Sequence, residues 1–251
     1  MGKLEKLQAA SATDRQARID LAAAFRLAVR MDLHEGVCNH FTLMLPDGKR
    51  FLLNAYGLHW SEVTASNLLA LDAKGKVLEG EGEAEKTAFH IHSRIHLANP
   101  QAACVLHTHM PYATALTLTE PGRLEMVEQN ALRFADDLAY DDSYNGLVVD
   151  DAEGDRLARL LGDKRVLFLA NHGVIVAGPS VAEAFDLLYY LERACRLQVL
   201  ARATGLPFRK VRPEVVHETY RMILADTPKY AGAHFAALKR VLDREEPEYA
   251  R

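Results

Sequence analysis

Residues 166–178 contain two short apolar runs that meet at a polar bend. The runs are VLFLA at 166–170 and VIVAG at 174–178, and they flank the tripeptide Asn171-His172-Gly173. Gly173 and the β-branched residues of the runs disfavour one continuous helix through this stretch. The segment is therefore predicted to form two buried strands, with His172 at the bend between them.

Two hairpins are predicted in the first third of the chain. In the first, Asp47-Gly48 lies between two apolar runs, which is a strong hairpin signal. In the second, Gly75 supplies the turn. The expected strand pairs are 41–45 with 50–56, and 68–72 with 76–80. A further strand is expected at 102–109.

Helices are predicted between and after these strands. The longest begins at Ser180, an N-cap with Glu183 as its capping-box partner, and runs to Thr204 before Gly205. Residues 118–150 carry several turn signals and indicate no clear element. Residues 1–12 are expected to form a loose leader, and Thr13 is the expected N-cap of the first helix, 13–31. The other expected helices are 85–98, one that starts with 111–116, 153–161, 213–224 and 230–242.

The composition excludes several classes of protein. Hydrophobic residues make up 49% and charged residues 25%, which is ordinary for a globular chain. Lys and Arg number 30 against 34 Asp and Glu, a net charge of -4, so nucleic-acid binding is not expected. No apolar stretch approaches the ~20 residues that span a bilayer, so no membrane partner is expected.

The number and spacing of the cysteines indicate the cellular compartment in which the chain is expected. Three cysteines without a CxxC spacing argue against both a disulfide framework and a thiolate zinc site. The N-terminal residues are polar and charged and give no secretory signal. A reducing, cytoplasmic location is the expectation.

Three histidines form a candidate metal site. His107 and His109 lie at i and i+2 in CVLHTH, so a strand places both on one face. Neutral imidazoles aimed the same way suit a divalent ion, and His172 offers a third ligand. The alternatives are that the strand near a sheet edge simply carries polar residues and that Asn-His-Gly is an ordinary hairpin turn.

A rival histidine pair lies on the helix predicted at 85–98. His92 and His96 are at i and i+4, on one helix face, a spacing that also suits metal. His90 is on a different face. We favour the alternative in which His92 and His96 are packed and hydrogen-bonded inside the protein.

These segments resemble a known family. EKTAFHIHSRIHLANPQAACVLHTHMPYATAL, followed some sixty residues later by LFLANHGVIVAG, is similar to the class II aldolase/adducin family, and the similarity runs from about 14 to 205. The resemblance implies a three-layer α/β/α fold with a mostly antiparallel sheet. We expect a single domain over 1–251, with its core at about 14–205 and a helical tail at 206–251.

The resemblance also implies a chemistry. Enzymes of the family hold a divalent ion, usually zinc, with three histidines that correspond to His107, His109 and His172; manganese or iron are the alternatives. It further implies a homotetramer with active sites at subunit contacts, acting on a small-molecule substrate.

The sequence departs from the family at the acid–base position. The family's carboxylate position corresponds to Ala88 here. Glu85 could reach inward from the preceding turn, and His90 could act as a base because its ordinary pKa is about 6.5. The alternative for Glu85 is a place in a solvated acidic loop.

A second departure concerns the residues that hold phosphate in the family's sugar-phosphate enzymes. Asn39 and Gly57 match, but Tyr56 replaces a small hydroxyl residue and Lys86-Thr87 replaces a pair of serines. Lys86 could still bind phosphate as a point charge. Whether the substrate is phosphorylated stays open, with Asn39, Gly57, Lys86 and Thr87 as the candidate substrate-binding residues.

Three functions follow from the resemblance. The first is a metal-dependent lyase that cleaves a C–C bond of a hydroxy-carbonyl or sugar (phosphate) compound by retro-aldol chemistry. The second is a metal-dependent decarboxylase or oxygenase acting on a keto or aromatic acid, because some relatives follow these reactions. The third is a non-catalytic, adducin-like assembly module.

Overall fold

The computed structural model describes residues 3–148 and 150–251, with side chains from residue 12 on. The strands are β1 His40–Met44, β2 Arg50–Leu53, β3 Leu69–Asp72, β4 Val77–Glu79, β5 Cys104–Thr108, β6 Leu138–Asp141, β7 Val166–Leu169 and β8 Val174–Gly178. The α-helices are α1 Lys3–Arg30, α2 Lys86–Ala98, α3 Pro111–Thr117, α4 Asp151–Leu161, α5 Val181–Arg202 and α6 Pro213–Glu245. Short 3₁₀ helices lie at Trp60–Glu62, Ala131–Phe134 and Pro247–Ala250.

The strands of the described chain form one sheet in the order β4-β3-β2-β1-β5-β8-β7-β6. Neighbouring strands are antiparallel except for β6, which runs parallel to β7. Both predicted hairpins and the two strands around the 171–173 bend are confirmed. β1 and β5, which are far apart in the sequence, lie side by side at the middle of the sheet.

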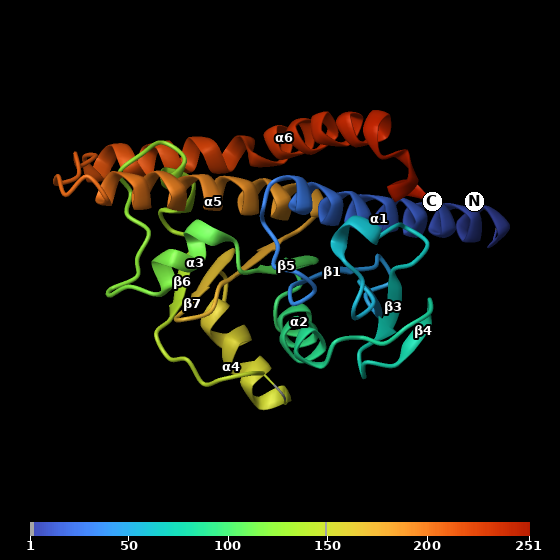
Figure 1. Cartoon of the computed structure of the whole chain (residues 1–251). Coiled ribbons are helices and arrows are strands. Elements are labelled where there is room, and N and C mark those ends of the chain that lie inside the picture. Colours follow the sequence, from blue (N-terminus) through green and yellow to red (C-terminus); the bar gives the residue numbers. More distant parts are fainter. Residues whose placement is uncertain (1–2, 149) are drawn as a thin grey trace.

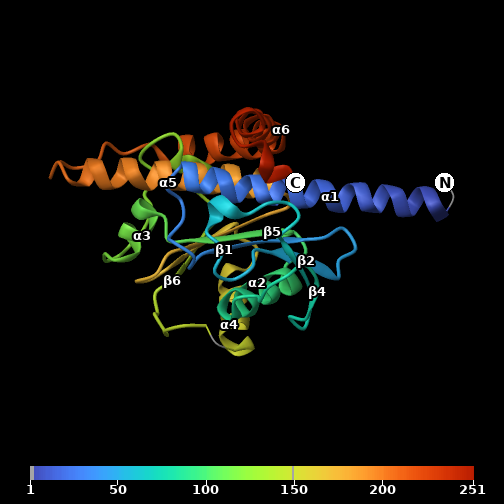
Figure 2. The ribbon, with the colours of Figure 1, turned by 45° about the vertical axis from the view of Figure 1, so that its right-hand side comes forward.

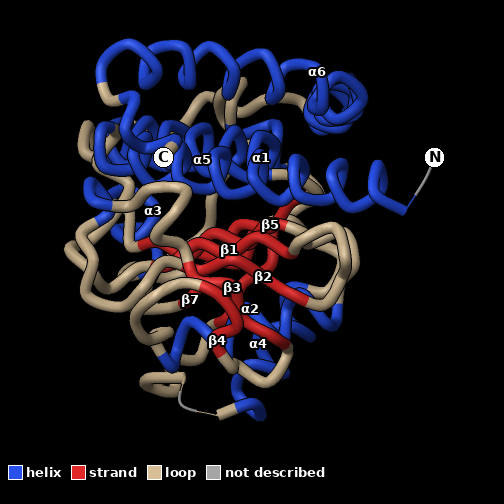
Figure 3. The backbone as a smooth tube through the Cα atoms, turned by 90° about the vertical axis from the view of Figure 1, so that its right-hand side faces the viewer, coloured by secondary structure: helices blue, strands red, loops and turns tan. Residues whose placement is uncertain are grey.

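Helices cover both faces of the sheet, which confirms the predicted three-layer α/β/α fold (Figure 1). α1 and α5 pack on one face with α6 over them, and α2 and α4 lie on the other (Figures 2 and 3). The apolar core is divided accordingly. Phe25, Phe41 and Leu188 belong to the core on the α1 and α5 side, whereas Ile91, Val105 and Ile175 belong to the core under α2 and α4.

Two helix predictions were wrong. The first helix begins at Lys3, not at Thr13, because residues 3–12 are mostly strong helix formers and a possible cap does not interrupt them. Residues 1 and 2 of the predicted leader lie outside the described residues. The two tail helices are one helix, α6, with Pro228 inside it.

α6 continues through Pro228 because its packing outweighs the backbone hydrogen bond that a proline cannot make. Thr227 donates its hydroxyl hydrogen to the Ile223 carbonyl oxygen at 2.9 Å, and Phe235 packs its ring 5.8 Å from that of Phe185 on α5. Among the described helices, none combines the length and apolar character that a membrane crossing needs.

Candidate metal centre

His107, His109 and His172 meet beside the end of β5. His107 lies on β5, His109 follows it, and His172 is in the bend between β7 and β8, the strand paired with β5. One ring nitrogen from each histidine lies within 4.8 Å of the other two. The ring centroids are 4.6–5.0 Å apart. The structure therefore brings together the three histidines predicted as ligands.

The bend is shaped so that His172 lies directly against β5. Asn171 adopts the left-handed conformation, with φ of 57°. A Cβ at Gly173 would lie 2.5 Å from the carbonyl oxygen of Thr108 and 2.8 Å from the Cδ2 atom of His109. A glycine is thus required for the bend to approach the strand this closely.

Hydrogen bonds fix which nitrogen of two of these rings carries the proton. His107 Nδ1 is 2.9 Å from the Val174 carbonyl oxygen, and His109 Nδ1 contacts a carboxylate oxygen of Glu35. Both partners only accept, so each Nδ1 is the donor. Since a neutral imidazole has one N–H, the Nε2 atoms of both rings carry lone pairs.

The distance between these two lone-pair atoms fits a shared cation. His107 Nε2 and His109 Nε2 are 3.2 Å apart. Two nitrogen ligands of a tetrahedral ion, each at about 2.0–2.1 Å, are separated by about 3.3 Å. The partners at Nδ1 are of the kind that orients metal-bound histidines in proteins. The donor set therefore fits a divalent cation.

Burial keeps His107 and His172 uncharged at neutral pH. Burial, followed by the neighbouring His109, lowers the pKa of His172 to about 4. Burial, followed by His40 and the other histidines, holds the pKa of His107 well below its usual range. Metal ligands must be deprotonated, so these rings are ready to bind at pH 7.

The stability of the metal-free protein is expected to fall as the pH is lowered. The pKa values of His40, His96 and His172 are lowered to about 3, 4 and 4, with burial as the main cause. Unfolded histidines take up protons near pH ~6.5, so below that pH the unfolded chain binds more protons than the folded one. The contribution of these three histidines to the stability of the folded protein is complete above about pH 6.5 and is progressively lost toward pH 4.

One group acts in the opposite direction. Burial raises the pKa of Glu192 to about 7, so its effect on stability weakens as the pH rises toward neutrality. The three histidines together change the free energy of unfolding with pH more than the single carboxyl group of Glu192 does. Urea unfolding of chelator-treated protein at pH 7.5 and pH 5 checks the sign, and equal stability at the two values would show that these rings are not held neutral.

Glu85 serves as the N-cap of α2. Its Oε2 accepts from the backbone N–H of Ala88 at 2.8 Å and from the hydroxyl of Thr87. Burial raises the pKa of Glu85, but these hydrogen bonds and nearby His40 outweigh it, so the pKa is lowered. Lys86 follows in the first turn with an exposed side chain. The Oε1 atom of Glu85 stays outside the cap.

The structure does not bring His90 to the three histidines. Its Nδ1 lies 2.8 Å from Asp151 Oδ1, at the contact between α2 and α4. The two helices are close there, because a Cβ at Gly154 would lie 2.2 Å from the His90 carbonyl oxygen. His90 therefore belongs to the helix contact.

Asn39 lies at the cluster, and Gly57 lies in the turn that follows β2. Asn39 is buried, and its Oδ1 accepts from the backbone N–H of His109 at 3.3 Å. Its Nδ2 is buried without a hydrogen-bond partner among the described residues. Gly57 has a φ of 83° and follows the exposed Tyr56. Among the described residues, no hydrogen bond joins Gly57 to the three histidines.

Comparisons with known proteins identify the family. A family model described as the class II aldolase and adducin N-terminal domain matches residues 19–199. The chain belongs to this family. A relative from Pseudomonas aeruginosa, provisionally named as an aldolase class 2 protein, is 32% identical over 95% of this chain and 93% of its own length.

Two further relatives show the range of this class II aldolase and adducin family. An adducin-related protein of Schizosaccharomyces pombe is 36% identical over 92% of this chain and 75% of its own. The crystal structure of an aldolase II superfamily protein from Pseudomonas syringae has a TM-score of 0.88 and 33% identity, covering 95% of this chain and 96% of that one.

In this family member, His92 and His96 are internal, as we favoured from the sequence. Both are buried, and both bond to the hydroxyl of Thr42, at 2.6 and 2.7 Å. His92 also contacts His40, a residue of β1 whose ring centroid is 4.9 Å from that of His107.

Sequence reasoning missed His40 and Glu35. Strand alternation identifies His40 as a neighbour of His107 only once β1 is known to pair with β5, where the two residues are in register. Glu35 lies in the loop before β1, and its side chain is mostly exposed. Its contact with His109 joins segments 74 residues apart, and no local pattern signals it.

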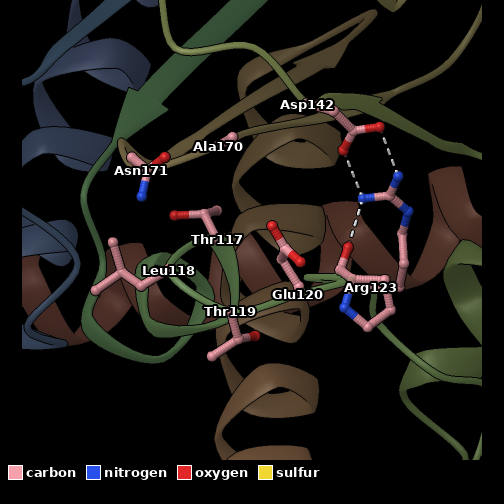
Figure 4. Close-up of a pocket in the computed structure, with 9 residues that line it drawn as sticks. Thr117, Leu118, Thr119, Glu120, Arg123, Asp142, Ala170 and Asn171 are labelled. Carbon is pink, nitrogen blue, oxygen red and sulfur yellow. Dashed lines mark hydrogen bonds and ion pairs between the residues drawn. The ribbon is translucent and has the colours of Figure 1, made fainter.

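A polar cleft of about 640 Å³ opens beside the bend (Figure 4). Asn171, which precedes His172, is in its wall together with Thr117 and Thr119. On the opposite side, Arg123 makes two hydrogen bonds of 2.8 Å to Asp142. None of the three histidines lines this cleft, and because its arginine is already paired with Asp142, the cleft offers little free positive charge.

Proposed function

We propose that the chain is a metal-dependent lyase that cleaves a C–C bond of a small hydroxy-carbonyl or sugar (phosphate) compound by retro-aldol chemistry. His107, His109 and His172 hold the cation, with zinc as the first candidate and manganese or iron as alternatives. The observation that carries this proposal is the pair of lone-pair nitrogens 3.2 Å apart, with a third ring beside them. Membership of the family supports it.

The chain's own residues supply the rest of the site. A bound divalent cation acts as a Lewis acid that polarises a carbonyl group and stabilises negative charge on its oxygen. Asn39 offers its unpartnered Nδ2 as a donor to substrate. Gly57, Lys86 and Thr87 are proposed to line the substrate site, as their counterparts do in the family.

Proton transfer falls to Glu85 in this proposal. Its Oε1 is not used in capping α2, and its charge acts on His40 at the cluster. A carboxylate with a lowered pKa accepts a proton weakly, so turnover is expected to be slow. The place of His90 against Asp151 favours a structural role for it, although the sequence offered it as a second base.

A decarboxylase or oxygenase is the second candidate. Ala88, at the family's carboxylate position, is completely buried in an apolar cluster with Phe51 and Leu71. This position thus lacks the carboxylate with which family enzymes carry out demanding acid–base chemistry, and decarboxylation of a keto acid tolerates that loss. An adducin-like assembly module is the third candidate, favoured by the 36% identity to the adducin-related protein.

We also propose a cytoplasmic homotetramer with subunit contacts near the active site, following the family. Light scattering on the purified chain tests this assembly: four copies are expected, and a monomer at all concentrations would contradict it.

The test of function is a screen of the zinc, manganese and iron forms against hydroxy-carbonyl compounds, sugar phosphates, keto acids and aromatic carboxylates. Aldehyde release that stops on chelation and returns with metal is the expected result. Release of carbon dioxide or uptake of oxygen would identify the second candidate. A metal-loaded protein with no turnover on any compound would favour the assembly module.

A further inference from the structure

A chain of buried hydrogen bonds leads from the core to the three-histidine cluster. It begins at the Ala102 carbonyl oxygen, 2.6 Å from His96 Nδ1. His96 Nε2 is 2.7 Å from the Thr42 hydroxyl, which is 2.6 Å from His92 Nδ1. His92 Nε2 is 2.7 Å from His40 Nδ1. All four side chains are buried.

The Ala102 carbonyl oxygen, where the chain of hydrogen bonds ends, determines which atom donates in each of the first bonds. A carbonyl oxygen only accepts, so His96 Nδ1 is the donor and His96 Nε2, in the neutral ring, carries a lone pair. Thr42 must then donate its one hydroxyl hydrogen to His96. Its oxygen can only accept on the other side, which makes His92 Nδ1 a donor.

The same reasoning fixes the tautomer of His40. His92 Nε2 carries a lone pair, so His40 donates from Nδ1 and keeps a lone pair on Nε2. All three rings are neutral: burial lowers the pKa of His96 to about 4 and that of His40 to about 3, and holds that of His92 well below its usual range. Because the chain ends on a carbonyl, it orients His40 and offers no path for a proton to leave.

His40 presents this lone pair beside the cluster. His40 and His107 are paired residues on β1 and β5, so their side chains lie on the same face of the sheet. His40 is 3% exposed, and its Nε2, on the ring edge away from the backbone, makes no hydrogen bond to any described residue. A bound molecule that donates to this free acceptor gains a hydrogen bond, and with it affinity.

We propose that His40 Nε2 accepts a hydrogen bond from a hydroxyl group of the ligand that binds at the three-histidine cluster. The inference rests on the proposed function in taking that ligand to be a hydroxy-carbonyl compound, and it adds the requirement that the ligand's hydroxyl group keeps its hydrogen. A neutral lone-pair nitrogen repels a carboxylate or phosphate oxygen, so the anionic part of any substrate lies elsewhere.

The tautomer can be measured without a ligand. Nitrogen-15 NMR of the metal-free protein is expected to show His40 with a protonated Nδ1 and an unprotonated Nε2. Thr42→Ser keeps the hydroxyl and is expected to keep this state, whereas Thr42→Val breaks the chain and yields a mixture of tautomers. A protonated Nε2 in the unmodified protein, or one unchanged tautomer in Thr42→Val, would overturn the argument.

The acceptor role can be measured with two simple ketones. Hydroxyacetone carries the hydroxyl hydrogen, and methoxyacetone has a methyl group in its place. The zinc-loaded protein is expected to bind hydroxyacetone about tenfold more tightly, the effect of one net hydrogen bond. His40→Phe is expected to lose this preference, and His217→Phe, at an exposed site on α6, is expected to keep it.

The outcomes separate this inference from the proposed lyase. Equal affinity for the two ketones, no binding of either, or a preference that survives in His40→Phe would overturn it. If His40→Phe fails to fold, Thr42→Val replaces it, with a weakened preference expected and an unchanged one contradicting the proposal. A preference without any retro-aldol turnover would leave the inference standing and overturn the lyase.

Discussion

Replacing His107 with alanine is expected to lower the affinity for zinc by more than ~100-fold. Loss of a residue that only hydrogen-bonds to a metal ligand costs up to ~100-fold, and loss of the ligand itself should cost more. His107 is buried, and the bond from its Nδ1 to the Val174 carbonyl oxygen holds the ring in place, so alanine removes a ligand that is already oriented. The variant should also lose any metal-dependent turnover.

Competition with a chromophoric chelator measures this affinity. Two further variants provide an intermediate case and a control. Glu35→Ala removes only the partner of His109 Nδ1 and should cost ~10- to 100-fold. His217→Ala, on the exposed surface of α6, should cost nothing. Zinc affinity that is equal in all three variants would place the bound metal elsewhere in the protein.

Gly173→Ala is expected to damage both stability and metal binding. Its Cβ would meet the Thr108 carbonyl oxygen at 2.5 Å and His109 Cδ2 at 2.8 Å, so the bend or the His109 ring must shift. Forcing extra volume into a packed site costs about 1–3 kcal/mol of the free energy of unfolding. Zinc affinity should fall as well, because the displaced atom belongs to a proposed ligand.

The helical residue Gly232 provides the control for this substitution. A Cβ there meets nothing within 4 Å, so Gly232→Ala should raise stability by about 0.5–1 kcal/mol through helix propensity alone. Urea unfolding of the two variants compares them directly. A Gly173→Ala protein as stable as the unmodified chain and equal to it in zinc affinity would show that the bend is not packed against β5 as described.

Local patterns predicted most of the sheet and the helices around it. Asp47-Gly48, Gly75 and the 171–173 bend each lie between short apolar runs, and turn chemistry of this kind acts within a few residues. β6 was not predicted, because its four residues follow a long irregular segment and it is held by parallel pairing with β7. The continuity of α6 through Pro228 depends on packing against α5, which no window of sequence reports.

The candidate site shows the same division. The i, i+2 spacing of His107 and His109 is a local signal, and His172 is identified by its position between two apolar runs. His40 joins the site through the pairing of β1 with β5, a contact across 67 residues of sequence. The sequence suggested that Glu85 could reach inward to the site; the structure makes Glu85 the N-cap of α2, with one carboxylate oxygen left outside the cap.

The most direct test of the central claim is an anomalous difference map at the zinc edge from crystals of the zinc-loaded protein. The account predicts one strong peak about 2.0–2.1 Å from a ring nitrogen of His107, His109 and His172. A map with no peak between these rings, or with the ring of His172 turned away from the bound zinc, would contradict it.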